Sequence, residues 1–116
     1  MLRQFCKAKI AGAIVQKSLL KYEGSCGIDT AILEAADIAA GEWILIANVT
    51  TGARFETYVI AEPAGSGAMN IYGAAARHAA VNDEIIIMSF AWLDAAESKT
   101  FKGPRVVKLK AGNKLS

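Results

Sequence analysis

An apolar run and an alternating run, joined by a turn, constrain the fold of this 116-residue chain more than any other feature. Trp43–Ala47 is almost continuously apolar, Asn48–Gly52 has the residues of a tight turn, and Arg54–Ala61 alternates with a period of two. The alternation divides this second run into two faces, Arg54, Glu56, Tyr58 and Ile60 on one and Phe55, Thr57, Val59 and Ala61 on the other. The pattern predicts a strand–turn–strand unit.

Other segments favour further short strands over helices. The predicted extended stretches are Leu2–Ile10, Ala13–Leu20 after a break at Gly12, Met69–Tyr72 and Glu84–Trp92, with a tight loop over Tyr22–Gly27. One helix is predicted over Thr30–Ala36, with Asp29 as its N-cap and Gly41 ending the pattern. Many short strands with one or two short helices predict a mainly β fold, a small closed β-barrel, because closure removes exposed strand edges.

Composition excludes several classes of protein. The chain is 53% apolar and 21% charged, as expected for a protein with a core. Its most apolar stretch, Glu84–Leu93, is shorter than the ~20 residues that a membrane helix needs, and the first residues lack the apolar centre of a signal peptide. Cys6, Cys26 and a single histidine, His78, suggest neither a disulfide framework nor a zinc site. We expect a cytoplasmic protein without a metal.

The charge is unevenly distributed. Residues 1–98 carry seven basic and eleven acidic side chains, a net charge of −4, whereas residues 99–116 carry six basic side chains and no acidic one. We therefore expect a domain over 1–93 and a basic, mobile tail over 94–116, with a strand at Val106–Leu109 left open. Because the tail has one aromatic residue, Phe101, it lacks the stacking pattern of single-strand binders, and no nucleic-acid or membrane partner is predicted.

The pair Gly24–Ser25 is the most unusual chemical feature. A serine hydroxyl in a constrained turn can attack the preceding carbonyl, and glycine leaves that approach open. The resulting ester can eliminate and hydrolyse, which cleaves the chain and leaves a pyruvoyl ketone at the new N-terminus. Taken alone, a Gly-Ser pair indicates only an ordinary turn.

Several further motifs change that interpretation. Tyr22-Glu-Gly-Ser-Cys26 with Ile28-Asp29 resembles the processing site of the pyruvoyl-dependent aspartate 1-decarboxylases. Lys9, the segment Asn48–Tyr58, Gly73-Ala-Ala-Ala76 and Asp83–Phe90 are similar to that family in order and spacing. The resemblance covers residues 1–93 and implies a double-psi β-barrel, a homotetramer with sites at subunit interfaces, and decarboxylation of L-aspartate to β-alanine for pantothenate and coenzyme A synthesis.

The resemblance also implies roles for individual residues. Ser25 becomes the pyruvoyl group, which forms a Schiff base with L-aspartate and replaces pyridoxal phosphate; Gly24 supplies the attacked carbonyl; and Thr57 hydrogen-bonds that carbonyl. Tyr58 returns a proton after carbon dioxide leaves. The implied substrate-binding residues are Lys9, Arg54, Thr57, Gly73, Ala74 and Ala75, with Tyr72 as a further candidate.

Two positions depart from the family's usual pattern. Ala11 stands where a histidine is common, and Tyr72 stands where an asparagine usually precedes Gly73. In the family, the resemblance implies, the histidine shapes hydrogen bonding around the processing loop and the asparagine holds the substrate or intermediate. The two departures therefore leave slow self-processing, altered substrate preference and a maturation factor as an additional partner open. Cys26 is interpreted as a small buried residue and His78 as a surface residue. The alternatives are an unprocessed, non-enzymatic binding barrel and a pyruvoyl decarboxylase of another amino acid, such as glutamate.

Overall fold

Nine strands form one sheet in the computed structural model, which describes residues 1–116, and their order is β2-β6-β3-β5-β4-β7-β1-β8-β9. The strands are β1 (Arg3–Ile14), β2 (Lys17–Leu19), β3 (Ser25–Asp29), β4 (Trp43–Asn48), β5 (Arg54–Glu62), β6 (Met69–Tyr72), β7 (Glu84–Leu93), β8 (Arg105–Lys110) and β9 (Lys114–Leu115). The helices are α1 (Thr30–Ala36), the 3₁₀ helix η1 (Gly73–His78) and α2 (Ala95–Thr100). The prediction of a mainly β protein of small-barrel type is confirmed, with three short helices where one or two were expected.

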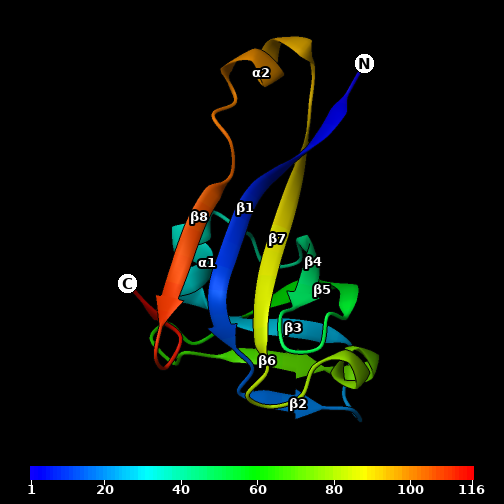
Figure 1. The fold of residues 1–116 in the computed structure, drawn as a ribbon, viewed down its shortest axis with the longest axis vertical. Coiled ribbons are helices and arrows are strands. Elements are labelled where there is room, and N and C mark those ends of the chain that lie inside the picture. The colour runs from blue at the N-terminus through cyan, green and yellow to red at the C-terminus, as the bar shows by residue number, and fades with distance from the viewer.

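The strands run in two directions, and β5 belongs to both sets. In Figure 1, β1, β7 and β8 run along the long axis of the molecule, whereas β2, β3 and β6 lie across it. The first part of β5 pairs with β4, from Ala47–Arg54 to Trp43–Tyr58, and its last part pairs in parallel with β3, starting at Cys26–Val59. The change of partner falls between Tyr58 and Val59, beside the start of β3.

Branched aliphatic side chains fill the core. Such side chains suit strands because they pack well on a pleated surface. Fully buried isoleucines come from β1, β3, β4, β6 and β7: Ile10, Ile28, Ile44, Ile46, Ile71, Ile85 and Ile87. The two predicted faces of β5 are confirmed at its first residues, where Phe55, Thr57 and Val59 are buried and the residues between them are exposed.

Helix α1 begins and ends as predicted, and its cap has a second function. The Asp29 carboxylate accepts a hydrogen bond from the Ala31 N–H at 2.8 Å, which confirms the N-cap, and also from the backbone N–H groups of Gly65 and Gly67 at 3.0 and 2.8 Å. Burial alone would raise the pKa of Asp29, but these backbone hydrogen bonds outweigh it and lower the pKa. Asp29 therefore fixes both the helix and the loop that precedes β6.

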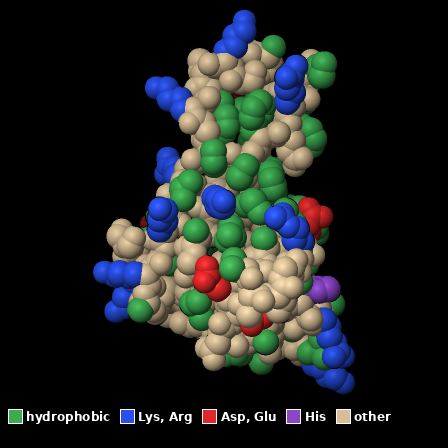
Figure 2. Space-filling view, viewed as in Figure 1, with side chains coloured by type: hydrophobic (Ala, Val, Ile, Leu, Met, Phe, Trp, Pro, Cys, Tyr) green, Lys and Arg blue, Asp and Glu red, His purple; other side chains and the backbone are tan.

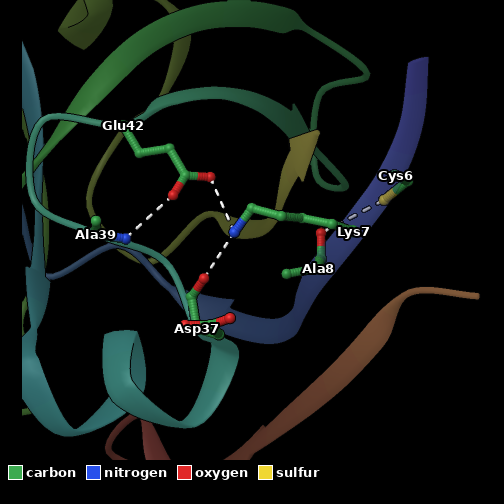
Figure 3. Close-up of polar contacts among 6 residues, drawn as sticks. All are labelled: Cys6, Lys7, Ala8, Asp37, Ala39 and Glu42. Carbon is green, nitrogen blue, oxygen red and sulfur yellow. Dashed lines mark hydrogen bonds and ion pairs between the residues drawn. The ribbon is translucent and has the colours of Figure 1, made fainter. Parts of the chain in front are cut away.

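A bulge in β1 directs Lys7 toward the other end of α1. The register between β1 and β7 shifts between Cys6 and Ala8. Figure 3 shows the Lys7 ammonium between the Asp37 carbonyl oxygen, at 2.6 Å, and the Glu42 carboxylate, at 3.1 Å. A cation is favourable there because the last carbonyls of a helix carry partial negative charge. The contact ties β1 to the segment that connects α1 with β4.

The C-terminal residues are part of the sheet. Strand β8 pairs in parallel with β1, from Ala8–Arg105 to Ala11–Lys108, and Val107 is buried. Asn113 is buried, and its side-chain amide accepts a hydrogen bond from the Ile14 N–H and donates hydrogen bonds to the backbone carbonyls of Ile14 and Gly67. The predicted boundary at residue 93 therefore does not separate a barrel from an unpaired tail; the mobility of the segment stays a prediction.

Two predicted boundaries near the N-terminus were wrong. Gly12 does not interrupt β1, because its φ of +77° lies within a second bulge, between Ile10 and Ala13, after which pairing with β7 continues. The loop predicted over Tyr22–Gly27 ends earlier than expected, since β3 starts at Ser25 and all five of its residues are buried. The Gly24–Ser25 bond thus lies at the junction of a loop and a buried strand.

Candidate active site

Ser25 is the first residue of β3 and is 2% exposed. It pairs with Tyr72 of the antiparallel strand β6, so the two side chains lie on the same face of the sheet. The next residue, Cys26, points into the core and is fully buried, as predicted, and burial raises the pKa of its thiol to about 12. Such a thiol stays protonated and is a poor nucleophile.

The same geometry places Tyr58 beside Ser25. Cys26 and Val59 form the first pair between β3 and β5, and both point into the core. Extending this parallel register by one residue brings Ser25 next to Tyr58, on the face opposite the core. Tyr58 is 37% exposed. Ser25 therefore has a tyrosine on each neighbouring strand, Tyr58 on β5 and Tyr72 on β6.

Gly24 and Gly73 make a close backbone contact. Gly73 has a φ of +77°, and a Cβ atom at this position would lie 2.6 Å from the Gly24 Cα. A Cβ on Gly24 itself would meet only the Tyr72 carbonyl oxygen, at 3.9 Å. The two glycines thus differ: Gly73 allows the close approach of the loop, whereas Gly24 has open space beside it. The predicted substrate-binding role of Gly73 stays a prediction.

A cavity of about 280 Å³ lies next to the Gly24–Ser25 bond. It lies beside the first part of β5, which has no partner on β3 and against which η1 packs. Its lining residues come from the loop, β5 and η1: Gly24, Phe55, Glu56, Thr57, Ala74, Ala75 and His78. The structure thus gathers four residues that the sequence predicted, namely Gly24, Thr57, Ala74 and Ala75, around one cavity.

The predicted cations lie elsewhere. Lys9 on β1 pairs with Met88, Met88 with Leu45, and Leu45 with Glu56, so these residues form one row across the outer face. Lys9 is three strand spacings from β5, roughly 14 Å. Arg54 is exposed on the outer face of β5, two residues before Glu56. The structure of one chain does not bring Lys9 to Ser25.

Tyr72 is held by polar and aromatic contacts. It is 7% exposed, its hydroxyl accepts a hydrogen bond from Asn70 Nδ2 at 3.0 Å, and its ring centroid is 4.7 Å from that of Tyr22. Asn70 also donates to the Glu62 carboxylate at 3.3 Å. Burial raises the pKa of Tyr72, and the charge of Glu62 adds to this, while the hydrogen bond from Asn70 opposes it. Tyr72, one of the two positions that depart from the family's usual pattern, is therefore held in place beside Ser25.

Known proteins support the interpretation of this geometry. The family model for aspartate decarboxylase matches residues 1–116. An aspartate 1-decarboxylase of Methylibium petroleiphilum is 50% identical over 99% of this chain and 95% of its own length. Relatives of the same name from Xanthomonas axonopodis and Pelotomaculum thermopropionicum are 49% and 45% identical, over 95% and 99% of this chain and 86% of their own lengths. The chain belongs to the aspartate decarboxylase family.

The residues of this family member fit a pyruvoyl group made from the chain itself. Ser25 is buried, its predecessor is a glycine with open space beside it, and Thr57 lines the cavity beside the bond. Tyr58 and Thr57 lie on opposite faces of β5, and Gly24 and Thr57 line the same cavity. No cluster of three or more potential metal ligands is present, and no helix is long and apolar enough to cross a membrane.

Three residues of the cavity, Phe55, Glu56 and His78, were not predicted as site residues from the sequence. The rings of Phe55 and His78 stack at a centroid distance of 5.3 Å with an interplanar angle of 25°. His78 is exposed, as predicted, but it also lines the cavity beside Gly24. The only signal in the sequence that His78 lies near the site was its position shortly after Ala74–Ala76. The packing of η1 on β5, which brings His78 to the cavity, is a long-range contact that the sequence does not reveal.

Proposed function

We propose that this chain decarboxylates L-aspartate to β-alanine and carbon dioxide, using a pyruvoyl group that it makes by cleaving its own Gly24–Ser25 bond. The observation that carries the proposal is the buried Ser25 between Tyr58, Tyr72 and the Thr57 cavity in a chain of this family. The reaction supplies β-alanine for pantothenate and coenzyme A synthesis in the cytoplasm.

In the self-cleavage step, the Ser25 hydroxyl attacks the Gly24 carbonyl carbon. The peptide C–N bond breaks as the ester forms, and the freed amine stays on Ser25. Thr57 donates a hydrogen bond to the developing oxyanion from the cavity side, which is worth about 3–4 kcal/mol in comparable sites. Elimination across the Ser25 Cα–Cβ bond then releases the Gly24 carboxylate, and hydrolysis of the remaining enamine releases ammonia.

In the decarboxylation step, the ketone supplies an electron sink of the kind that pyridoxal phosphate provides in other enzymes. Tyr58, beside Ser25, holds the proton that returns to the substrate carbon after carbon dioxide leaves. The backbone N–H groups of Ala74 and Ala75, where small side chains leave the main chain accessible, bind substrate oxygens. Lys9 and Arg54 bind carboxylates, and the fork of the arginine allows two parallel hydrogen bonds.

The position of Lys9 supports sites at subunit interfaces. Because Lys9 lies about 14 Å along the sheet from β5, a second copy of the chain has to supply it. The outer face is also suited to association, since Trp43, Tyr58 and Trp92 are 57%, 37% and 62% exposed. We therefore include the homotetramer in the proposal, with the outer face of the sheet as the contact surface.

The test is turnover of L-aspartate followed by NMR. The native chain is expected to form β-alanine. Ser25→Ala is expected to form none, and Tyr58→Phe is expected to lose activity by about a hundredfold or more while still cleaving its chain. Turnover of L-glutamate in place of L-aspartate would favour the alternative substrate, and an intact chain without either activity would favour a binding protein.

A further inference from the structure

His78 lines two cavities. It lines the cavity of about 280 Å³ beside Gly24 and Thr57, and it also lines a larger one of about 510 Å³. The larger cavity lies between the β4–β5 turn and the end of η1, with Thr51, Gly52 and Asp83 among its lining residues. His78 is the one side chain common to both sets of lining residues. His78 therefore forms part of the wall of the smaller cavity.

One contact of the ring and one of the backbone hold His78 in place. It stacks on Phe55, and the backbone carbonyl of His78 accepts a hydrogen bond from Asn48 Nδ2 at 3.0 Å. Asn48 is 2% exposed and also donates to the Asp83 carboxylate at 2.9 Å, so this anchor is part of the buried framework. A stacked imidazole turns its face to its partner and its N–H edge outward. His78 is exposed and lines the cavity, and no hydrogen bond of its ring to another residue competes with a ligand.

The charge around the cavity indicates what this edge does. Glu56 and His78 are the only titratable side chains among the lining residues. A dicarboxylate in this cavity is repelled by Glu56, so it requires a hydrogen-bond donor to compensate. Within one chain, Lys9 is about 14 Å away from β5 and Arg54 does not line the cavity. Of the lining side chains, the Thr57 hydroxyl and the His78 ring can donate a hydrogen bond, and of these two only His78 is exposed.

We propose that His78 determines substrate specificity: its ring N–H binds the carboxylate of the substrate that is retained, and its bulk excludes longer dicarboxylates from the cavity beside Gly24. This inference rests on the proposed function and deepens it, because it makes one side chain responsible for the preference for a four-carbon over a five-carbon substrate. Figure 2 shows the imidazole at the surface, so a substitution there leaves the core intact.

The test uses binding in the absence of any reaction. The Ser25→Ala chain is titrated calorimetrically with succinate and with glutarate, which have no amine and differ by one methylene group. Succinate is expected to bind more tightly than glutarate. His78→Ala is expected to weaken succinate binding about tenfold, the usual effect of losing a hydrogen bond to a charged group, and to reduce the preference over glutarate.

Two further variants separate the two parts of the proposal. His78→Phe retains a ring of similar size that can stack on Phe55, so it is expected to lose succinate affinity and still exclude glutarate. His78→Gln keeps an N–H donor without the ring, so it is expected to retain more succinate affinity and admit glutarate. The matched control is Arg77→Ala, which removes a neighbouring cation that lines only the larger cavity, and it is expected to bind both ligands like the parent.

The same variants are then made with Ser25 intact, and the ratio of kcat/KM for L-aspartate to that for L-glutamate is measured. We expect His78→Ala to lower this ratio about tenfold without slowing chain cleavage. Unchanged succinate binding in His78→Ala, an equal loss in Arg77→Ala, or no succinate binding by the Ser25→Ala parent would each overturn the inference. Failure of the proposed function is recognised separately, by the absence of chain cleavage or of aspartate turnover in the native protein.

Discussion

The contact between Gly73 and Gly24 leads to a quantitative prediction for Gly73→Ala. A Cβ at Gly73 would lie 2.6 Å from the Gly24 Cα, 2.8 Å from the Gly24 nitrogen and 2.9 Å from the Tyr22 carbonyl oxygen. All three are backbone atoms, so no side chain can rotate to relieve the contact. Carbon atoms pack at about 3.5–4.0 Å, and the loop before Ser25 therefore has to move by about 1 Å.

Two energies contribute to the loss of stability. The φ of +77° at Gly73 costs an alanine about 1–2 kcal/mol, and forcing an extra methyl group against packed backbone costs about 1–3 kcal/mol. The expected loss is about 2–5 kcal/mol. A displacement of about 1 Å at reacting atoms can reduce a rate about a hundredfold, so we expect cleavage of the Gly24–Ser25 bond to slow by that factor.

Gly65→Ala is the matched control. Gly65 has a φ of +81°, yet a methyl group added there would meet no atom within 4 Å, so this variant carries the conformational cost without the contact. Stability is measured by urea unfolding in a Ser25→Ala background, and cleavage is followed by gel electrophoresis of freshly purified chain with Ser25 intact. Equal stability losses in the two variants, or cleavage of Gly73→Ala at the native rate, would refute the reasoning.

Three other predictions concern neighbouring residues. Backbone hydrogen bonds lower the pKa of Asp29, so the stability that its carboxylate contributes is present above the usual pKa of 3.8 and is lost as the pH falls through the lowered pKa. In urea unfolding at pH 6, Asp29→Asn should be less stable than the native chain by about 1–3 kcal/mol. The difference should become smaller as the pH is lowered to 2. Burial and a pKa of about 12 should keep Cys26 unreactive, so titration of the native protein with a thiol reagent at pH 8 is expected to modify only the partly exposed Cys6; rapid reaction of two thiols would contradict the buried position of β3. Tyr72→Phe keeps the ring contact with Tyr22 and is expected to cleave its Gly24–Ser25 bond within about threefold of the native rate. Tyr72→Leu loses that contact and should cleave the bond at least about tenfold more slowly. Equal cleavage rates of the two variants in a gel assay would show that the ring pair does not hold the loop.

Local patterns predicted those elements whose contacts are close in sequence. The alternation in Arg54–Ala61 identified both faces of β5, and Asp29 marked the start of α1 because a carboxylate cap acts on the N–H groups that follow it. The second role of Asp29, binding Gly65 and Gly67, could not be predicted because it depends on where a distant loop lies.

Long-range pairing explains what the sequence did not show. The alternation of β8 is visible in Arg105–Lys110, but its cations made it resemble a solvated tail, and its partner β1 is about a hundred residues away. Burial of Val107 and the hydrogen bonds of Asn113 hold this segment to the sheet. Neither signal is local, so neither could be recognised before the fold was known.

In the candidate site, too, motifs predicted some residues and long-range packing decided the others. Gly24, Ser25, Thr57 and the Gly73–Ala75 segment were predicted from motifs, and the structure brings them together at the change of partner along β5. His78 was interpreted only as a surface residue because its stacking on Phe55 and its place between two cavities depend on the packing of η1.

The most direct test of the central claim is a denaturing mass spectrum of the purified native chain. We expect two fragments, residues 1–24 and residues 25–116, and a larger fragment ~17 Da lighter than one that begins with serine, because a ketone has replaced the amine. Ser25→Ala should give a single intact chain. An intact native chain, or a cleaved one that still begins with serine, would contradict the proposed self-processing and the chemistry that depends on it.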